Sequence, residues 1–228
     1  KASKELGLYQ FVNFINPIRH EAMKTYAYEI VEALGRAPEA MFHPVGTGGG
    51  IWGAWKGYRE LHMLGLSQSL PRMVSVQPAV TAHFEQAFLQ KKREAGAYGD
   101  PTKTIAQSIA ADSPLQGGRR ILKAIYDSNG LALGVTEDEI LQAMRDLARE
   151  GIAAEPASAA SVAAMKRSRL SGWLKDGDTA VCVITGSALK QPAAVMRAAG
   201  VPKERLHADF ESLRALLQTA GPPDTGRA

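Results

Sequence analysis

The feature that most constrains this chain is a loop with four glycines among the five residues at positions 46–50. An apolar run, Ala40-Met41-Phe42, precedes it, and a helical pattern over 52–64 follows. A strand, a glycine loop and a helix in this order present unpaired backbone N–H groups to an anion at a helix N-terminus. Glycine suits such a loop because it tolerates positive φ and lets an anion approach the amides. We interpret the loop as a phosphate-binding site; the alternative is a flexible turn that only joins two elements.

Apolar runs alternate with helical patterns along the whole chain, which is typical of an α/β fold with a mostly parallel sheet. After the first run, strands are predicted at 72–76, 131–135 and 179–184. The last of these is continuously apolar, a pattern typical of a strand buried on both faces. Helices are predicted at 19–34, 52–64, 81–90, 116–128, 136–150, 156–169 and 203–218. Ligands of such sheets bind beyond the carboxyl ends of the strands, where the glycine loop and Thr185 both fall.

Composition excludes several classes of function. The apolar share of 45% and the charged share of 22% are ordinary for a globular protein. No long apolar stretch and no signal-peptide pattern occurs, so we expect a cytoplasmic protein without a membrane partner. The net charge of +4 is dispersed, and its one basic run, 91–93, lacks flanking aromatic residues, so no nucleic-acid partner is expected.

Cysteine and histidine give no sign of a disulfide or a metal site. The single cysteine, Cys182, lies within an apolar run and is expected to be a buried, inert thiol. The five histidines show no metal-ligand spacing, so no metal is expected, and we interpret them as structural or surface residues. They are His20, His43, His62, His83 and His207.

The glycine loop does not match the common nucleotide-binding motifs. No Gly-Lys-Ser/Thr closes it, so it is not a Walker A loop. Gly46, Gly48 and Gly53 do not form G-x-G-x-x-G in register, and Gln77 ends the next strand where a ribose-binding acid is expected. A dinucleotide-binding Rossmann domain is therefore the weakest of the interpretations we carry forward.

Four stretches of the sequence, taken together, give the glycine loop a more specific interpretation. They are Asn16–Thr25, Pro44–Gly50, Gly151–Ala160 and Val183–Lys190. In this order they resemble the fold-type II pyridoxal phosphate enzymes, and within them the threonine synthase branch, over about Gly7 to Ala198. The resemblance implies a three-layer αβα large domain with a mostly parallel sheet over residues 1–205. Residues 206–228 would add a C-terminal helix and a disordered tail.

The resemblance also implies roles for particular residues. Gly46, Thr47, Gly48, Gly49 and Gly50 would bind the 5′-phosphate of pyridoxal 5′-phosphate through their backbone N–H groups. Thr185 would place a neutral hydroxyl against the pyridine nitrogen, and Asn13 and Arg19 would contact the phosphate of O-phosphohomoserine. Without the resemblance, Arg19 is equally a solvated residue at a helix start. Thr185 would then be a turn former after a strand, and Glu155 a charge at a helix N-terminus.

The implied activity is that of a lyase that acts on amino acids by β/γ-elimination or replacement. The nearest case is the conversion of O-phosphohomoserine to threonine and phosphate in threonine biosynthesis, by an enzyme that commonly forms a homodimer. The family's Schiff-base lysine lies in an N-terminal segment that this sequence, which opens at Lys1, does not contain. We therefore expect the C-terminal portion of a longer enzyme, with the missing N-terminal segment as its partner. Alone it would be inactive, with no catalytic residue of its own.

Two departures keep other functions open. The loop reads Gly-Thr-Gly-Gly-Gly where threonine synthases usually carry asparagines, and Phe14 replaces a small hydroxyl residue. Threonine dehydratase-like and cysteine synthase-like members therefore remain alternatives. From a different class, the chain could be a non-catalytic module that binds a phosphorylated ligand or pairs with another subunit.

Overall fold

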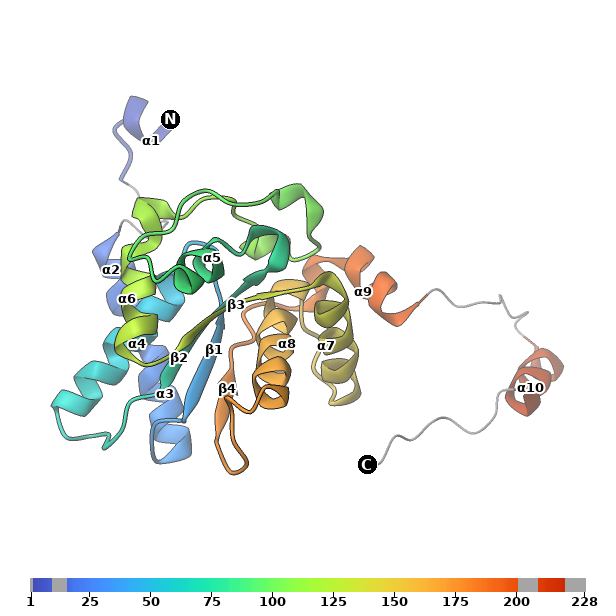
Figure 1. Ribbon diagram of the computed structural model, residues 1–228. Coiled ribbons are helices and arrows are strands. Elements are labelled where there is room, and N and C mark those ends of the chain that lie inside the picture. The colour runs from blue at the N-terminus through green and yellow to red at the C-terminus, as the bar shows by residue number, and fades with distance from the viewer. Residues whose placement is uncertain (1, 10–15, 201–208, 220–228) are drawn as a thin grey trace. The chain divides into compact units, whose positions relative to one another are not determined.

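The computed structural model describes residues 2–9, 16–200 and 209–219 (Figure 1). The chain divides into two units, Lys1–Ala198 and Ala199–Ala228. In the second unit the described helix is α10 (Phe210–Thr219). The tail predicted to be disordered lies outside the described residues beyond position 219.

Four parallel strands form the sheet of the first unit, as the alternating pattern predicted. They are β1 (Ala40–Pro44), β2 (Arg72–Pro78), β3 (Leu131–Val135) and β4 (Ala180–Cys182), in the order β3-β2-β1-β4. Phe42 of β1 pairs with Val74 on one side and Cys182 on the other. Strand β1 is thus central, with a neighbour on each side.

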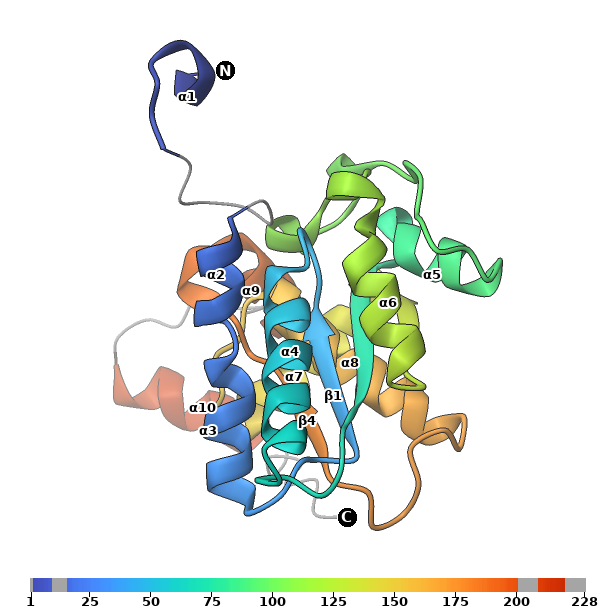
Figure 2. The same ribbon diagram turned by 90° about the vertical axis from the view of Figure 1, so that its left-hand side faces the viewer.

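Helices cover both faces of this sheet and make three layers (Figures 1 and 2). One face packs against α3 (Thr25–Leu34), α4 (Gly49–Met63) and α6 (Arg119–Asp127). The other face packs against α7 (Glu137–Arg149) and α8 (Pro156–Leu170). Alternate strand residues serve the two layers, because successive side chains of a strand point to opposite faces. Met41 is fully buried on the first face and Phe42 on the second.

The other elements of the first unit are short. The helices are α1 (Ala2–Glu5), α2 (Pro17–Ala22), α5 (His83–Leu89) and α9 (Pro192–Ala199). The 3₁₀ turns are η1 (Ala79–Thr81), η2 (Pro101–Lys103), η3 (Gln107–Ile109), η4 (Leu115–Gly118) and η5 (Ala188–Lys190). None of the helices in the described ranges has both the length and the apolar character needed to cross a bilayer.

The predicted helix over 19–34 is wrong as a single element, because α2 and α3 are separate. The chain turns at Met23 and Lys24, where α4 approaches closely. A Cβ on Gly53 of α4 would lie 2.4 Å from the Cβ of Met23. The predicted end at Gly35 is confirmed, since Gly35 has the left-handed φ of 70° that favours glycine.

The prediction for 116–128 starts its helix too early. Gln116, Gly117 and Gly118 have φ values of 51°, 66° and 61°, so they form a left-handed turn, and α6 begins only at Arg119. The helix over 136–150 is confirmed as α7, with its predicted capping box between Thr136 and Glu139.

The strand predicted over 179–184 is shorter and less buried than expected. β4 has three residues, all half-buried, and it is an edge strand of the described sheet. Cys182 is accordingly half-buried. The atoms packed around its thiol keep water away, and this desolvation raises the pKa of the thiol to about 12. The thiol therefore stays protonated and inert at neutral pH, as predicted.

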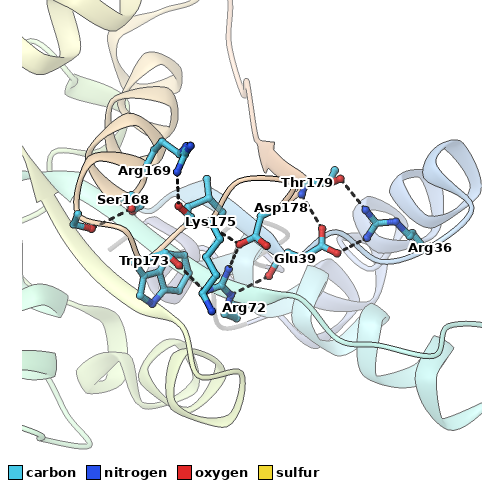
Figure 3. Close-up of polar contacts among 11 residues, drawn as sticks. Arg36, Glu39, Arg72, Ser168, Arg169, Trp173, Lys175, Asp178 and Thr179 are labelled. Atoms are coloured by element: carbon cyan, nitrogen blue, oxygen red, sulfur yellow. Dashed lines mark hydrogen bonds and ion pairs between the residues drawn. The ribbon is translucent and has the colours of Figure 1, made fainter.

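A polar cluster joins the amino ends of β1, β2 and β4 (Figure 3). We call it the Arg72 clamp: Arg36, Glu39, Arg72, Trp173 and Asp178. The Arg72 guanidinium donates to the carbonyl of Trp173 at 2.9 Å, to the Asp178 carboxylate at 2.8 Å and to the carbonyl of Glu39 at 3.3 Å. It also lies over the Trp173 ring, 3.9 Å from the centroid. Each nitrogen of this guanidinium thus donates to the fold, and one of its faces lies on an aromatic ring.

The second arginine of the clamp completes the connection to β4. Arg36 donates to the Glu39 carboxylate at 2.6 Å and to the Thr179 hydroxyl at 2.8 Å. The backbone N–H of Thr179 donates to the other oxygen of Glu39 at 2.8 Å. The hydrogen bond from Arg36 is the main cause that holds the pKa of Glu39 below its usual value. The clamp therefore anchors the amino end of β4, which begins directly after Thr179.

Candidate functional site

The glycine loop connects β1 to α4 at the carboxyl end of the sheet. Gly48 is the N-cap residue of α4, with φ 84°, and no side chain caps the helix. The backbone N–H of Trp52 donates to the Gly48 carbonyl at 3.2 Å, so the N–H groups of Gly49, Gly50 and Ile51 precede the first intrahelical hydrogen bond. An uncapped helix start of this kind binds an anion through its free N–H groups and the helix dipole.

Packing requires glycine at two positions of the loop. A Cβ on Gly48 would lie 2.0 Å from Cδ1 of Ile121 in α6, and its positive φ disfavours any other residue. A Cβ on Gly50 would lie 2.3 Å from Nε2 of His43. The loop is therefore held against α6 and β1 and is more than a flexible turn.

His43 lies beneath the loop as a neutral ring. It is 5% exposed, and burial lowers its pKa to about 4. Nδ1 lies 2.8 Å from the carbonyl oxygen of Pro44, which can only accept, so Nδ1 carries the proton. Nε2 has no hydrogen-bond partner among the described residues. His43 thus fills space next to Gly50 without adding charge, in agreement with the structural role predicted for it.

Arg19 lies next to the loop. It is half-buried on α2, and its Nε lies 3.9 Å from the Cβ position of Gly49. Within the described ranges, no carboxylate forms an ion pair with Arg19. The positive charge of Arg19 and the amino end of α4 therefore act on the same place, which favours a doubly charged anion. Asn13, the other predicted substrate contact, lies outside the described residues.

Thr185 lies at the same edge of the sheet as the glycine loop. It follows β4, which pairs in parallel with β1, and the backbone N–H of Val183 continues this pairing to the Phe42 carbonyl at 3.0 Å. The chain leaves β1 for β2 through α4 and comes back to β4 through α8, on the opposite face. The crevice at such a change of direction is where open α/β sheets bind their ligands.

Ser158 connects Thr185 to α8. It is fully buried in the first turn of this helix, and its Oγ lies 3.1 Å from Oγ1 of Thr185. The backbone N–H of Gly186 donates to the same Oγ at 2.8 Å. Thr185 itself is an exposed residue, and its hydroxyl contacts the buried Ser158.

A buried carboxylate, that of Glu155, lies between the glycine loop and the loop that follows β4. Glu155 is 2% exposed, its backbone N–H donates to the Gly186 carbonyl at 3.0 Å, and Ser108 Oγ donates to its carboxylate at 3.3 Å. Lys190 pairs with this carboxylate at 3.7 Å. The carbonyl of Ser108 also lies 3.2 Å from the Cβ position of Gly46, so Ser108 joins the glycine loop to Glu155.

Ser158 lies within Gly151–Ala160, a stretch whose resemblance implies a helix start that supports the site, but no contact was predicted for it or for Ser108. Ser158 lies in a helix rich in alanine and serine, where no local pattern separates it from Ser161. Ser108 precedes no motif at all. Both are recognised only once the fold brings them to Thr185 and Glu155. In the described ranges no group of three or more His, Cys, Asp or Glu residues is placed to hold a metal ion.

Comparison with known proteins identifies relatives of this chain. Residues 1–186 match the family described as "Pyridoxal-phosphate dependent enzyme". The threonine synthase of Methanocaldococcus jannaschii is 37% identical over 218 residues, which are 95% of this chain and 53% of that protein. The threonine synthase of Mycobacterium bovis is 38% identical over 201 residues, which are 86% of this chain and 52% of that protein. The chain thus spans about half the length of these curated relatives.

Solved structures share the fold. The processed form of threonine deaminase isoform 2 from Solanum lycopersicum superposes with a TM-score of 0.67 over 87% of this chain and 55% of that one. The sequences are 20% identical, so this likeness concerns the fold alone. The predicted fold, an αβα arrangement around a parallel sheet, is confirmed by the four-stranded sheet and by this superposition.

Proposed function

The chain belongs to the family of pyridoxal-phosphate-dependent enzymes, and we propose that it provides the phosphate-binding side of the cofactor site of a threonine synthase-like lyase. The observation that carries this proposal is the uncapped start of α4, where packing requires glycine at positions 48 and 50. Thr185, at the end of the neighbouring strand, supplies the second contact that such a cofactor needs.

The residues present fit pyridoxal 5′-phosphate. The N–H groups of Gly49 and Gly50 would hold its phosphate, supported by the dipole of α4. The hydroxyl of Thr185 would contact the pyridine nitrogen, and a neutral contact there leaves the ring nitrogen without a proton. When bound, the cofactor stabilises negative charge that develops on an amino-acid substrate, which permits elimination and replacement reactions.

We propose a phosphorylated amino acid, O-phosphohomoserine, as the substrate. The relatives named threonine synthase support this choice. Arg19 supports it physically, because a guanidinium that the described residues leave without an ion pair binds a phosphate in a bidentate manner. Asn13 is proposed as a second contact to the same phosphate. The reaction belongs to the whole protein that contains this chain.

Binding of the cofactor can be tested on the chain itself. Titration with pyridoxal 5′-phosphate should give saturable binding, and pyridoxal, which lacks the phosphate, should bind at least ten-fold more weakly. Equal binding of the two compounds would contradict the phosphate role of the loop. Tight binding of NAD in place of pyridoxal phosphate would favour a dinucleotide-binding domain.

The substrate can be tested on the full-length protein that carries this chain. Threonine and inorganic phosphate should form from O-phosphohomoserine, and Arg19→Gln should raise KM for this substrate far more than it lowers kcat. Turnover of threonine or serine, with none of O-phosphohomoserine, would assign the chain to a dehydratase-like member. Cofactor binding without any turnover would favour a non-catalytic module.

A further inference from the structure

The hydroxyl of Ser158 contacts two residues of the loop that follows β4, Thr185 and Gly186. Its hydroxyl accepts a hydrogen bond from the Gly186 N–H at 2.8 Å and lies 3.1 Å from Thr185 Oγ1 and 3.3 Å from the Gly186 carbonyl. Ser158 itself is fully buried, although Thr185 is exposed. The hydroxyl of the exposed Thr185 therefore contacts a partner that the fold holds in place.

The number of protons limits how this pair can be arranged. Ser158 has one hydroxyl proton, so it donates either to Thr185 or to the Gly186 carbonyl. The Gly186 carbonyl already has a donor, the backbone N–H of Glu155 at 3.0 Å, whereas Thr185 Oγ1 contacts Ser158 alone among the described residues, at 3.1 Å against the 3.3 Å from Ser158 to the carbonyl. Donation from Ser158 to Thr185 is therefore the favoured arrangement.

We propose that Ser158 is a positioning residue that directs the hydroxyl proton of Thr185 outward. When Ser158 donates to Thr185 Oγ1, the proton of Thr185 is left for an acceptor on the open side of the site. This rests on the proposed function, in which that acceptor is the ring nitrogen of pyridoxal phosphate. Ser158 thereby fixes the ring nitrogen as a hydrogen-bond acceptor and opposes its protonation, although it does not touch the cofactor.

The test uses this chain and 4-deoxypyridoxine 5′-phosphate labelled with ¹⁵N in the ring, which has no aldehyde to react with lysines. The ¹⁵N resonance distinguishes a free, a hydrogen-bonded and a protonated ring nitrogen. Loss of one hydrogen bond in Ser158→Ala should weaken binding of this probe by about five-fold. The resonance should move from its wild-type position toward the position found in Thr185→Val. Affinity for inorganic phosphate, which reports on the glycine loop alone, should not change.

Ser161→Ala is the matched control. Ser161 is equally buried on α8, but it donates to the carbonyls of Ser158 and Val183 and does not contact Thr185. It should leave the ¹⁵N resonance at the wild-type position. In a Thr185→Val background, Ser158→Ala should have no further effect on probe affinity, because the hydroxyl that it directs is gone.

The outcomes separate this inference from the proposed function. If wild type binds the probe and Ser158→Ala leaves both affinity and resonance unchanged, the inference is wrong and the proposed function stands. An equal loss of affinity with and without Thr185 would show that Ser158 only supports Gly186, and would also overturn the inference. If wild type binds neither probe nor phosphate, both proposals fail together.

Discussion

The two ends of the parallel sheet use their polar groups in opposite ways. At the amino end, the Arg72 guanidinium has three hydrogen-bond acceptors and an aromatic ring, all from the fold (Figure 3). At the carboxyl end, the first N–H groups of α4 have no side-chain cap, and Thr185 is an exposed residue whose hydroxyl contacts Ser158 alone among the described residues. His43 Nε2 lacks a partner among the described residues there.

This contrast separates stability from function. Groups that are already paired contribute to folding and have little capacity left for a ligand. Groups that the fold holds in place but leaves unpaired cost stability and gain a partner only when a ligand binds. We therefore expect changes at the Arg72 clamp to alter unfolding, and changes at the glycine loop to alter ligand binding.

The largest effect is expected at the clamp. Arg72→Ala removes the guanidinium donor from the Asp178 carboxylate and from the carbonyls of Glu39 and Trp173, although Asp178 still accepts from the backbone N–H of Lys175 and Glu39 from that of residue 72. Removing one partner of such a partly buried network should lower the free energy of unfolding by about 4 kcal/mol. Urea denaturation measures this, with Arg72→Lys as the control that keeps the charge and loses the fork. A loss below about 1 kcal/mol would place the clamp among ordinary surface ion pairs.

The next effect is a pH dependence that arises beneath the loop. His43 has a pKa near 4 in the folded chain because of burial, against 6.5 in the unfolded chain. The unfolded state therefore binds the extra proton between these values, so stability is complete above about pH 6.5 and is lost as the pH falls toward 4. The expected loss from this group is on the order of 3 kcal/mol.

The variant His43→Leu isolates this contribution. Its free energy of unfolding should fall less steeply between pH 6.5 and 4 than that of the wild type. His83, whose pKa burial also lowers to about 4, contributes to the same slope, and His83→Leu is the matched control. Identical slopes for the wild type and His43→Leu would show that His43 is solvated and charged in the folded chain.

The smallest effect is a difference of about 2 kcal/mol between two alanine variants, caused by one methyl group in the loop. Gly48→Ala and Gly65→Ala both place alanine at a positive φ, 84° and 73°, but only the first meets a neighbour, Ile121. Gly65→Ala should cost about 1 kcal/mol for the backbone alone, and Gly48→Ala about 2 kcal/mol more. Only Gly48→Ala should also weaken phosphate binding, measured by titration calorimetry. Equal behaviour of the two variants would mean that the loop is not held by α6.

Local patterns were enough to predict the strands, the capping box of α7 and the glycine loop. Features that depend on distant packing were not. The break at Met23 exists because Gly53 of α4 lets the chain approach, and neither segment signals this alone. Gln116 has a left-handed φ of 51° although it is not glycine. The apolar run of β4 predicted full burial, whereas its position at the edge of the described sheet depends on topology.

The candidate site shows the same limit. Residue types predicted the loop, and the family resemblance pointed to Thr185 and Arg19; the structure brings Arg19 next to the loop. Ser158 lies within Gly151–Ala160, which carries part of the resemblance, but its contact with Thr185 was not predicted because it depends on β4 being placed beside α8.

One measurement tests the contrast between the two ends most directly. Backbone amide resonances of the chain are followed while pyridoxal 5′-phosphate is added. We expect saturable shifts at Gly49, Gly50 and Thr185, with no change at the clamp residues Glu39 and Arg72. Two results would contradict the contrast between the two ends. One is shifts centred on the clamp residues, and the other is unchanged resonances at the glycine loop when the ligand is saturating.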